Sequence, residues 1–323
     1  MKRICLILLT VSVLMHGPSM VAEVSMEKEI RYHFQPHVIT EEIREFFGED
    51  FTDLFFGFCD ALLNGDDSYL CPDSHTEFEI WRTAGSCFPI ADKIAYADFP
   101  VGSPRKHPSG QAKIIYRYER ATCQSLIKSF QIRVEDLLNA SLPAACGDAE
   151  KALRLYRFFA REYRYDDEIL NDSKRRLEEG GAYRTIMTGQ GICWEIAAAY
   201  TYLLLQAGVD AGICCGIQEN GDVHEWNIVK LDGKYYYVDP TYAVSSPDTL
   251  KYFGMTEAER IKQGSFLPDA LWAFIIGEIK VQTLDVTDEK FKPLWYSADY
   301  EIDHHQVLYQ DNLGQQYTMN LEY

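Results

Sequence analysis

Residues 189–208 have the sequence GQGICWEIAAAYTYLLLQAG. The alanines and leucines after Cys193 favour a helix, and Gly208 is a typical residue just past a helix C-terminus. Cys193 is therefore expected in the first turn, where free backbone N–H groups and the helix dipole favour a thiolate over a thiol. A helix end alone lowers a thiol pKa too little for this, so a neighbouring imidazolium is also expected.

The segment that follows predicts a β-hairpin. Residues 211–218 and 223–231 have the composition of two apolar strands, and 234–239 of a returning strand. Asp232-Gly233 between the last two is a strong signal for a two-residue turn. Pro240 cannot donate to the ladder and is expected to end it.

The register of this hairpin brings a histidine near an aspartate. If Leu231 faces Lys234, then His224 faces Thr241, and Asp239 is the diagonal neighbour of His224 on the same face. Diagonal neighbours lie roughly 7–8 Å apart at Cα, within reach of an imidazole-to-carboxylate hydrogen bond.

These residues suit thiol catalysis. Cys193 would attack an acyl carbon, His224 would accept the thiol proton, and Asp239 would hold the imidazole tautomer and stabilise its cation. The backbone N–H of Cys193 is a natural oxyanion donor, and Gln190 and Trp194 are the nearest candidates for a second one or for substrate binding. The simpler alternative is that the cysteine and the histidine are packing residues.

Three segments resemble the transglutaminase-like superfamily of papain-like cysteine enzymes. Residues 190–194 are similar to its nucleophile segment, with Gly191-Ile192 inserted, and residues 224–227 and 237–241 resemble its histidine and aspartate segments. Glu225 stands where the family usually has a small residue, and Tyr242 where tryptophan is common.

The resemblance extends over residues 146–264 and implies an α+β fold. Its core would be papain-like, a nucleophile helix packed on an antiparallel sheet, with an α/β N-terminal extension. The expected organisation is a signal peptide at 1–24, a mixed region at 25–143, the catalytic domain at 144–265, and C-terminal strands at 266–323 that pack on it.

Composition limits the location and the partners. The chain has 323 residues, of which 47% are hydrophobic, so it can bury a large core. Lys2-Arg3 precede a short apolar run at 4–15, which predicts an export signal and a secreted or cell-surface protein. The net charge of −18 argues against nucleic acid or anionic membrane lipid as a partner, and a protein or peptide substrate is expected.

The sequence predicts no metal site and no cofactor. Adjacent strand residues such as His304-His305 or Cys214-Cys215 point to opposite faces, so neither pair suits joint ligation. Export permits disulfides, and the favoured group is the N-terminal one, with its pairing left open: Cys59, Cys71, Cys87, Cys123 and Cys146.

The flanking regions carry no chemical motif. Helices are predicted at 41–47 with Thr40 as its cap, at 53–63, from 73 through 81, and at 125–138. Strands are predicted at 94–99 and 113–118, and a C-terminal hairpin at 304–309 and 315–321. The N-terminal region is expected to pack on the catalytic domain and shape its cleft.

Three functions fit the sequence. The favoured one is an exported cysteine enzyme that hydrolyses amide bonds of peptides or proteins, as a peptidase or deamidase. The same acyl-enzyme would crosslink proteins if an amine replaced water, although the extra β-domains and calcium sites of animal crosslinking enzymes are not evident here. The other two are a non-catalytic binding module at the cell surface and a structural partner of other exported proteins.

Overall fold

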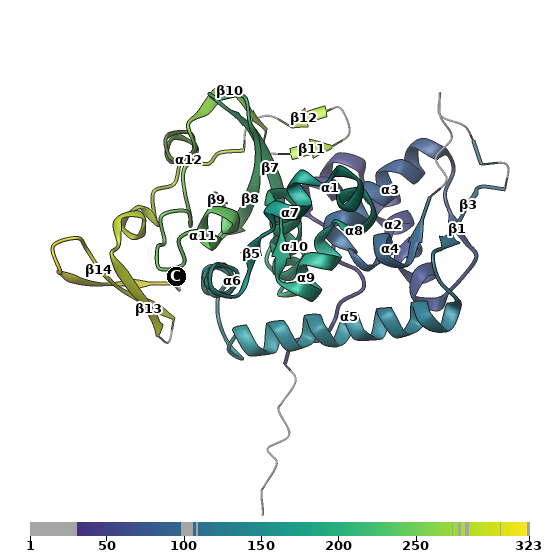
Figure 1. Cartoon of the computed structure of the whole chain (residues 1–323), viewed down its shortest axis with the longest axis horizontal. Coiled ribbons are helices and arrows are strands. Elements are labelled where there is room, and N and C mark those ends of the chain that lie inside the picture. Colours follow the sequence, from purple (N-terminus) through teal and green to yellow (C-terminus); the bar gives the residue numbers. More distant parts are fainter. Residues whose placement is uncertain are drawn as a thin grey trace, which may run out of the picture. The chain divides into compact units, whose positions relative to one another are not determined.

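A computed structural model describes residues 31–97, 106–107, 109–272, 274–276, 279–281, 284–303 and 305–321 (Figure 1). The expected signal peptide at 1–24 lies outside the described residues, as does much of the loop at 102–110. The described part is α+β, as predicted, and residues 31–323 form one compact unit.

The centre of the fold is a helix on an antiparallel sheet. Helix α10 (Cys193–Gln206) packs against a four-stranded sheet whose order is β10-β7-β8-β9. The strand bounds are β7 (Ala211–Gln218), β8 (Val223–Leu231), β9 (Lys234–Val238) and β10 (Phe266–Trp272). The predicted helix and the first two predicted strands are therefore confirmed.

The predicted turn and register of the β8–β9 hairpin are also confirmed. Leu231 pairs with Lys234, and Asp232 and Gly233 both have positive φ, as a type I′ turn requires. The expected facing of His224 and Thr241 is wrong, because Pro240 starts helix α11 (Pro240–Val244) and the ladder ends three pairs before it, at Asn227 and Val238.

Helix α10 is buried along nearly its whole length. The sheet covers one side, and α3 (Ser74–Cys87), α6 (Asp148–Glu162) and α9 (Ala182–Thr188) cover the others (Figure 1). Its alanines and leucines make this possible, since a helix that is apolar all round needs apolar neighbours on every side. Asn227 fastens the sheet to the helix, because its side-chain amide donates to the Ala197 carbonyl (2.9 Å) and to Thr201 Oγ1 (2.8 Å).

The opposite face of the sheet carries a second, smaller core. Trp226, Ile228, Tyr237 and Phe266 are buried there. Helix α12 (Glu257–Gly264) packs on β9 and β10, with Thr256 as its cap. Both faces of the sheet are therefore covered, which explains the near-continuous apolar runs of its strands.

The N-terminal region is mostly helical and shares the main core with α10. Thr40 caps α1 (Glu41–Phe47), as predicted, and Gly48, with φ of 83°, separates it from α2 (Glu49–Asn64). The long helix α5 (Arg120–Ser141) contacts α4 (Ile90–Ile94), α6 and α9.

The predicted strands of this region are shorter than expected. The described residues of 94–99 end helix α4 and form only β2 (Ala95–Tyr96), because the apolar residues 90, 91 and 94 have helical spacing. Residues 113–118 divide between β3 (Gln111–Lys113) and β4 (Ile115–Tyr116). Strand β3 pairs with β1 (Ser68–Leu70), and β4 pairs with β2.

Short elements connect α6 to α10. They are β5 (Arg164–Tyr165), α7 (Asp167–Asn171), α8 (Ser173–Glu179) and β6 (Gln190–Gly191), and β5 pairs in parallel with β6. This pairing lays the chain before the nucleophile helix alongside residues 164–165.

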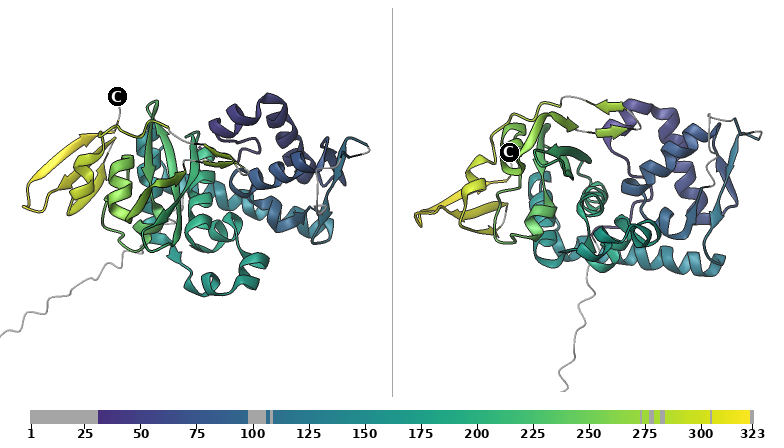
Figure 2. Two further views of the ribbon diagram at one scale, coloured as in Figure 1. Left: turned by 90° about the horizontal axis from the view of Figure 1, so that it is seen from above. Right: turned by 45° about the horizontal axis from the view of Figure 1, so that its top comes forward.

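The C-terminal region adds two small sheets. Strands β11 (Phe274–Ile276) and β12 (Ile279–Val281) pair with each other, and a 3-10 helix at Lys292–Tyr296 follows. The predicted hairpin is confirmed as β14 (Gln306–Gln310) and β15 (Gln316–Asn320), joined by β13 (Asp299–Asp303). In both views of Figure 2 this sheet lies on the side of the α10 core opposite to the N-terminal helices.

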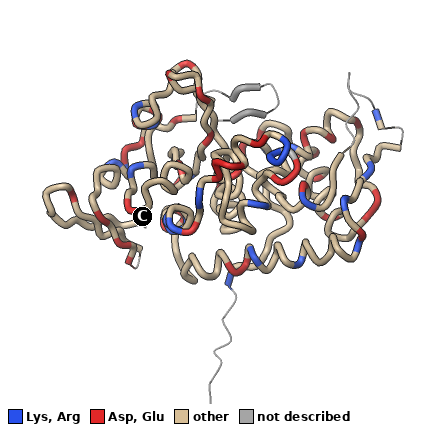
Figure 3. Tube along the Cα trace, in the orientation of Figure 1, with Lys and Arg blue, Asp and Glu red and all other residues tan. Residues whose placement is uncertain are grey.

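Acidic residues are spread over the helices and strands of the trace and are not gathered on one element (Figure 3). In the described part of the chain, no helix has the length and apolar character that a membrane span needs. The domain boundaries near residues 143 and 265 stay predictions.

Candidate active site

Cys193 lies at the start of α10, as the sequence predicts. It is the first residue of the helix, and Ile192 is the N-cap residue. The half-buried Cys193 thiol therefore sits where the backbone N–H groups of the first turn have no partners within the helix.

A buried ionic network holds this helix start in place. Glu195 Oε2 accepts the Ile192 N–H (3.1 Å) and pairs with Arg184 (2.8 Å), whose other nitrogen pairs with Asp166 (2.8 Å). Glu195 Oε1 accepts the Gly181 N–H (2.9 Å). The sequence analysis missed this network, although a glutamate three residues into a helix is a recognisable half of a capping box.

His224 and Asp239 form the predicted pair. His224 Nε2 and Asp239 Oδ2 are 2.8 Å apart, and both side chains are buried. Asp239 Oδ1 accepts the Tyr242 N–H (3.0 Å) and so caps α11. The carboxylate thus has one oxygen for the imidazole and one for the backbone, which fixes its orientation.

The structure adds an arginine to this pair. Arg260, on α12, is fully buried, and its Nη2 lies 2.8 Å from Asp239 Oδ2. Its guanidinium lies 4.6 Å from the ring centre of Trp226, 4.6 Å from Phe266 and 4.9 Å from Tyr242. These three rings are called the aromatic box below; their faces stabilise a desolvated cation.

The lack of a side chain at a glycine leaves the space that two rings of the aromatic box occupy. Gly216, on β7, pairs with His224 in the ladder. A Cβ atom at Gly216 would lie 2.8 Å from Trp226 Cη2 and 2.9 Å from Phe266 Cδ1, closer than real Cβ contacts. The rings occupy the space that any other residue's side chain would take.

The charged partners set the ionisation of Asp239. Burial alone would raise the pKa of this carboxyl, but the charges of His224 and Arg260, together with hydrogen bonds from His224 and the Tyr242 N–H, lower it overall. Asp239 therefore remains a carboxylate inside the protein, as its proposed role requires.

Cys193 has the opposite balance: its pKa is raised, so the expectation of a favoured thiolate is wrong. Burial raises the pKa of the Cys193 thiol to about 11, and the Glu225 carboxylate adds to this; backbone N–H groups of Glu225 and Trp194 lower it only in part. Desolvation outweighs the helix terminus because it acts on the whole thiolate charge.

Helix α10 packs against β8, the strand that carries His224. Glu225 directly follows His224 on β8, and its N–H lowers the pKa of the Cys193 thiol. The structure therefore brings the start of α10 to the strand that carries His224.

Tyr165, on β5, is a further residue that the sequence analysis missed. Burial raises the pKa of the Tyr165 hydroxyl to about 12, the Cys193 thiol raises it further, and the backbone N–H of Cys193 lowers it. The Tyr165 hydroxyl is thus near enough to Cys193 for that residue to shift its pKa. The parallel pairing of β5 with β6 accounts for this position.

The two candidates for substrate binding lie in different cavities. Trp194 lines a cavity of about 520 Å³, whereas the exposed Gln190 lines another of about 590 Å³. Their oxyanion roles stay predictions.

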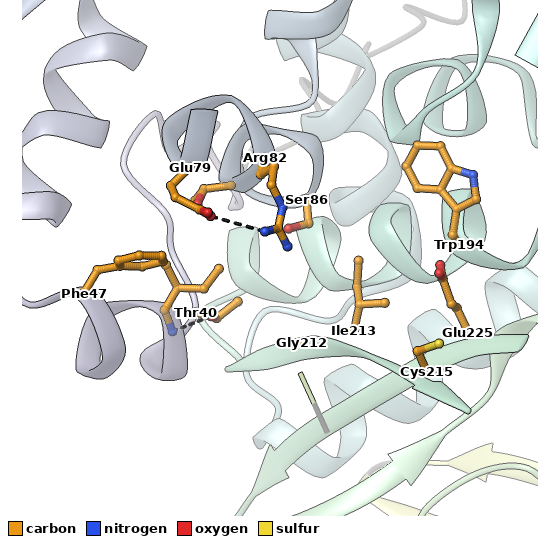
Figure 4. Close-up of a pocket in the computed structure, with 12 residues that line it drawn as sticks. Thr40, Phe47, Glu79, Arg82, Ser86, Trp194, Gly212, Ile213, Cys215 and Glu225 are labelled. Atoms are coloured by element: carbon orange, nitrogen blue, oxygen red, sulfur yellow. Dashed lines mark hydrogen bonds and ion pairs between the residues drawn. The ribbon is translucent and has the colours of Figure 1, made fainter. Parts of the chain in front are cut away.

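The first cavity, called the α3 cavity below, lies between α1, α3, β7 and β8 (Figure 4). Phe47, Ile43 and Ile213 give it apolar walls, and α3 contributes Glu79 and Arg82, which pair with each other at 3.4 Å. Trp194 and Glu225 line its other end, and each directly follows a predicted catalytic residue in the chain. A volume of this size suits a ligand side chain or a short peptide segment.

The cysteines do not form the predicted disulfides. All eight in the described residues are free thiols, and most are buried. Of the N-terminal group, Cys59, Cys71, Cys87 and Cys123 pack in the main core as small apolar side chains. Among the described residues, no three His, Cys, Asp or Glu side chains gather as metal ligands, and His305 pairs instead with Glu150 (2.7 Å).

Comparison with known protein families agrees with the site. Residues 136–240 match the model of the transglutaminase-like superfamily. This part of the chain is a transglutaminase-like core. The match begins within α5 and ends at Pro240, so it includes Cys193, His224 and Asp239.

Solved structures with a similar segment are distant from this chain. One is a proposed cysteine protease from Cytophaga hutchinsonii (16% identity, TM-score 0.28, covering 37% of this chain and 38% of that one). Another is a TGase (14% identity, TM-score 0.31, covering 39% of this chain and 34% of that one). A third is a proposed protease from Parabacteroides distasonis (11% identity, TM-score 0.26, covering 44% of this chain and 34% of that one). The chain thus spans little more than a third of the length of these structures. No curated protein matches it in sequence.

Proposed function

We propose that this protein is a cysteine enzyme that hydrolyses amide bonds in peptides or proteins through Cys193, His224 and Asp239. The observation that carries the proposal is the buried His224–Asp239 pair at 2.8 Å, with His224 on strand β8, which packs against the helix that begins at Cys193. Asp239 also caps α11 and pairs with Arg260, but neither contact requires a histidine, so the imidazole held by this carboxylate supports a catalytic role.

The chemistry follows from these positions. The Cys193 sulfur attacks the amide carbon, His224 takes the thiol proton and delivers it to the leaving nitrogen, and the C–N bond breaks to give a thioester and an amine. Water then attacks the thioester, His224 moves its proton to the sulfur, and a carboxylic acid and the free thiol result. Since the pKa of the thiol is about 11, its proton would leave as the carbonyl arrives.

Oxyanion stabilisation in this proposal comes from the Cys193 N–H and the Tyr165 hydroxyl. Cys193 shifts the pKa of the Tyr165 hydroxyl, which supports a position near the reacting carbonyl, where the hydroxyl would donate to the oxyanion. Asp239, kept ionised by Arg260, stabilises the imidazolium that forms while the proton is in transit.

The test is capture of the acyl-enzyme. The purified protein is incubated with an activated ester or amide probe and followed by intact mass spectrometry, together with Cys193→Ala and His224→Ala. We expect a mass increase of one acyl group that maps to Cys193, is absent in Cys193→Ala, and forms at least about 10³-fold more slowly in His224→Ala. Equal acylation of all three proteins would refute the proposal.

The raised pKa of Cys193 favours one alternative, a non-catalytic binding module. Such a protein would keep a thiol that is no more reactive than the other half-buried cysteine, Cys146. Labelling with iodoacetamide and peptide mapping would compare the two thiols directly. Preferential labelling of Cys193 supports the enzyme, and equal or slower labelling supports the module.

The reaction outcome and the location are part of the same proposal. A labelled primary amine added with a glutamine-bearing protein would be incorporated if the enzyme crosslinks, and ammonia or a new carboxyl terminus alone would indicate hydrolysis. Export is proposed from the N-terminal sequence, and an intact residue 1–24 segment on the protein isolated from its source would contradict cleavage of a signal peptide there.

A further inference from the structure

We propose, on the basis of the function proposed above, that the α3 cavity holds a cationic side chain of the peptide substrate, lysine or arginine, and that Glu225 selects it. Four observations carry this inference: the position of the cavity, the lack of a partner for Glu225, the chemistry of the walls, and the effect of Glu225 on the nucleophile.

The cavity adjoins the reacting groups. Trp194 follows Cys193 and Glu225 follows His224, and both line the same end of the α3 cavity. Figure 4 shows the Glu225 carboxylate directed toward the Trp194 ring, at the end away from Phe47. A substrate whose acyl carbon meets Cys193 therefore has a neighbouring side chain within reach of this end.

The Glu225 carboxylate lacks a partner. It is half-buried, and burial alone raises its pKa, to about 7. Within the described part of the chain it makes no hydrogen bond and no ion pair, unlike Glu79, which is paired with Arg82 in the same cavity. A half-buried carboxylate without a partner is stabilised most by a cation that arrives with the ligand.

The walls suit a long basic side chain. Phe47, Ile43 and Ile213 would contact its methylene groups, and the face of Trp194 would contact its charged head beside Glu225. Glu225 would repel an anionic side chain. Such a side chain could pair with Arg82 only by displacing Glu79. The net charge of −18 also attracts cationic peptides at long range.

Binding of a cation would also favour the thiolate. The charge of Glu225 contributes to the raised pKa of the Cys193 thiol. A bound ammonium or guanidinium would neutralise that charge and remove this part of the opposition to proton loss. A cationic substrate would then both occupy the cavity and make Cys193 more reactive.

The experiment compares cationic and neutral probes of equal size. Acylation of Cys193 by the p-nitrophenyl esters of Nα-acetyl-lysine and Nα-acetyl-norleucine is timed by intact mass and peptide mapping, which separates Cys193 from Cys215 in the same cavity. In the unmodified protein we expect the lysine ester to react about tenfold faster, the factor that about 1.4 kcal/mol of ion pairing supplies. In Glu225→Gln this preference should disappear, and in Glu219→Gln, an exposed carboxylate on the adjoining turn, it should persist.

A second pair of reagents keeps this inference separate from the proposed function. The cationic 2-aminoethyl and the neutral propyl methanethiosulfonate both form a mixed disulfide with a thiol and release methanesulfinate, without any acyl chemistry. If neither ester acylates Cys193 but the cationic thiosulfonate is preferred in a Glu225-dependent way, the cavity assignment stands and the hydrolase proposal fails.

Two outcomes would overturn the cavity assignment. One is equal rates for cationic and neutral probes in the unmodified protein. The other is a preference that Glu225→Gln leaves intact, in a variant whose circular dichroism matches the unmodified protein. Competition of butylammonium, but not of butanol, with the cationic thiosulfonate for the cavity gives a further test that needs no variant, and equal competition by both would also refute the assignment.

Discussion

Asp239 and Cys193 are both ionisable groups removed from water, yet the protein treats their charges in opposite ways. Asp239 has the guanidinium of Arg260, the imidazole of His224 and a backbone N–H as partners, and its pKa is lowered in spite of complete burial. Cys193 has two backbone donors and a neighbouring carboxylate, and burial raises its pKa to about 11. The charged and hydrogen-bonding partners of a group, and not burial alone, decide whether its pKa is raised or lowered.

This difference gives each end of the site its own task. The carboxylate end is permanently charged and holds the imidazole ready. At the thiol end the pKa is raised, and in the proposed reaction the proton leaves when the substrate arrives. A neutral resting thiol is also less prone to oxidation than a free thiolate would be.

Asp239→Asn should have the largest effect of the substitutions described below, because it removes the charge of the Asp239 carboxylate. The amide cannot stabilise an imidazolium, and it leaves Arg260 buried without an anion. We expect acylation of Cys193 to slow by roughly 10³–10⁴-fold, measured by intact mass against time. Asp172→Asn, which changes an exposed helix cap on α8, is the control and should react normally; a loss below tenfold in Asp239→Asn would show that this end does not matter for catalysis.

Arg260→Met tests the same end through stability. The substitution leaves the Asp239 charge with one partner fewer in the interior, and we expect the free energy of unfolding in urea to fall by about 3–5 kcal/mol. Arg161→Met removes an exposed pair with Asp248 (3.8 Å) and should cost less than about 1 kcal/mol. The double variant of Arg260→Met and Asp239→Asn should lose less unfolding free energy than the two single variants lose together. A loss equal to that sum would mean that the two residues do not interact.

Glu42→Gln tests, away from the active site, whether a buried carboxylate without partners has a raised pKa. Both oxygens of the buried Glu42 carboxylate lack hydrogen bonds among the described residues, and burial, with a smaller effect of the nearby Asp210 charge, raises its pKa to about 7. The folded protein therefore binds this proton more tightly than the unfolded chain, so Glu42 lowers stability as pH rises from about 4.3 to 7.

The variant should remove that part of the pH dependence. We expect Glu42→Gln to gain roughly 1–3 kcal/mol relative to the unmodified protein at pH 8 when compared with pH 4.5, measured by urea unfolding at both values. Glu45→Gln changes an exposed residue of the same helix and should gain nothing. A gain of equal size at both pH values would point to packing and not to charge.

Tyr165→Phe should give the smallest effect and tests the thiol end. Loss of the hydroxyl removes one donor to the developing oxyanion, and acylation of Cys193 should slow by about tenfold or more. The free energy of unfolding should change by less than about 1.5 kcal/mol, since the ring remains. Faster acylation in the variant would instead identify the hydroxyl as an obstruction over the sulfur.

The sequence predicts those parts of the site that local rules control. The helix at Cys193 follows from its alanines and leucines, and the nearness of His224 and Asp239 follows from the Asp232-Gly233 turn and strand alternation. Even the failed pair of His224 with Thr241 has a local cause, because Pro240 is compatible with the first turn of a helix.

The remaining parts depend on contacts between distant segments. Arg260 lies in a short helix beside glutamates, a pattern typical of an exposed arginine, and only packing against the aromatic box buries it. The pKa of Cys193 could not be predicted either, because a helix start and deep burial act in opposite directions and only the structure gives their balance. Tyr165 lies near Cys193 because β5 pairs in parallel with β6, and no sequence pattern of these two short strands predicts that pairing.

Gly216 shows how far such dependence can reach. It carries no charge and touches no substrate in the proposed reaction, but the indole of Trp226 and the ring of Phe266 fill the place of its missing side chain. A single methyl group there would push both rings toward Arg260, and the guanidinium would move relative to Asp239. The ionisation of Asp239, which directly follows β9, is thus tied to the absence of a side chain on β7, two strands away in the sheet.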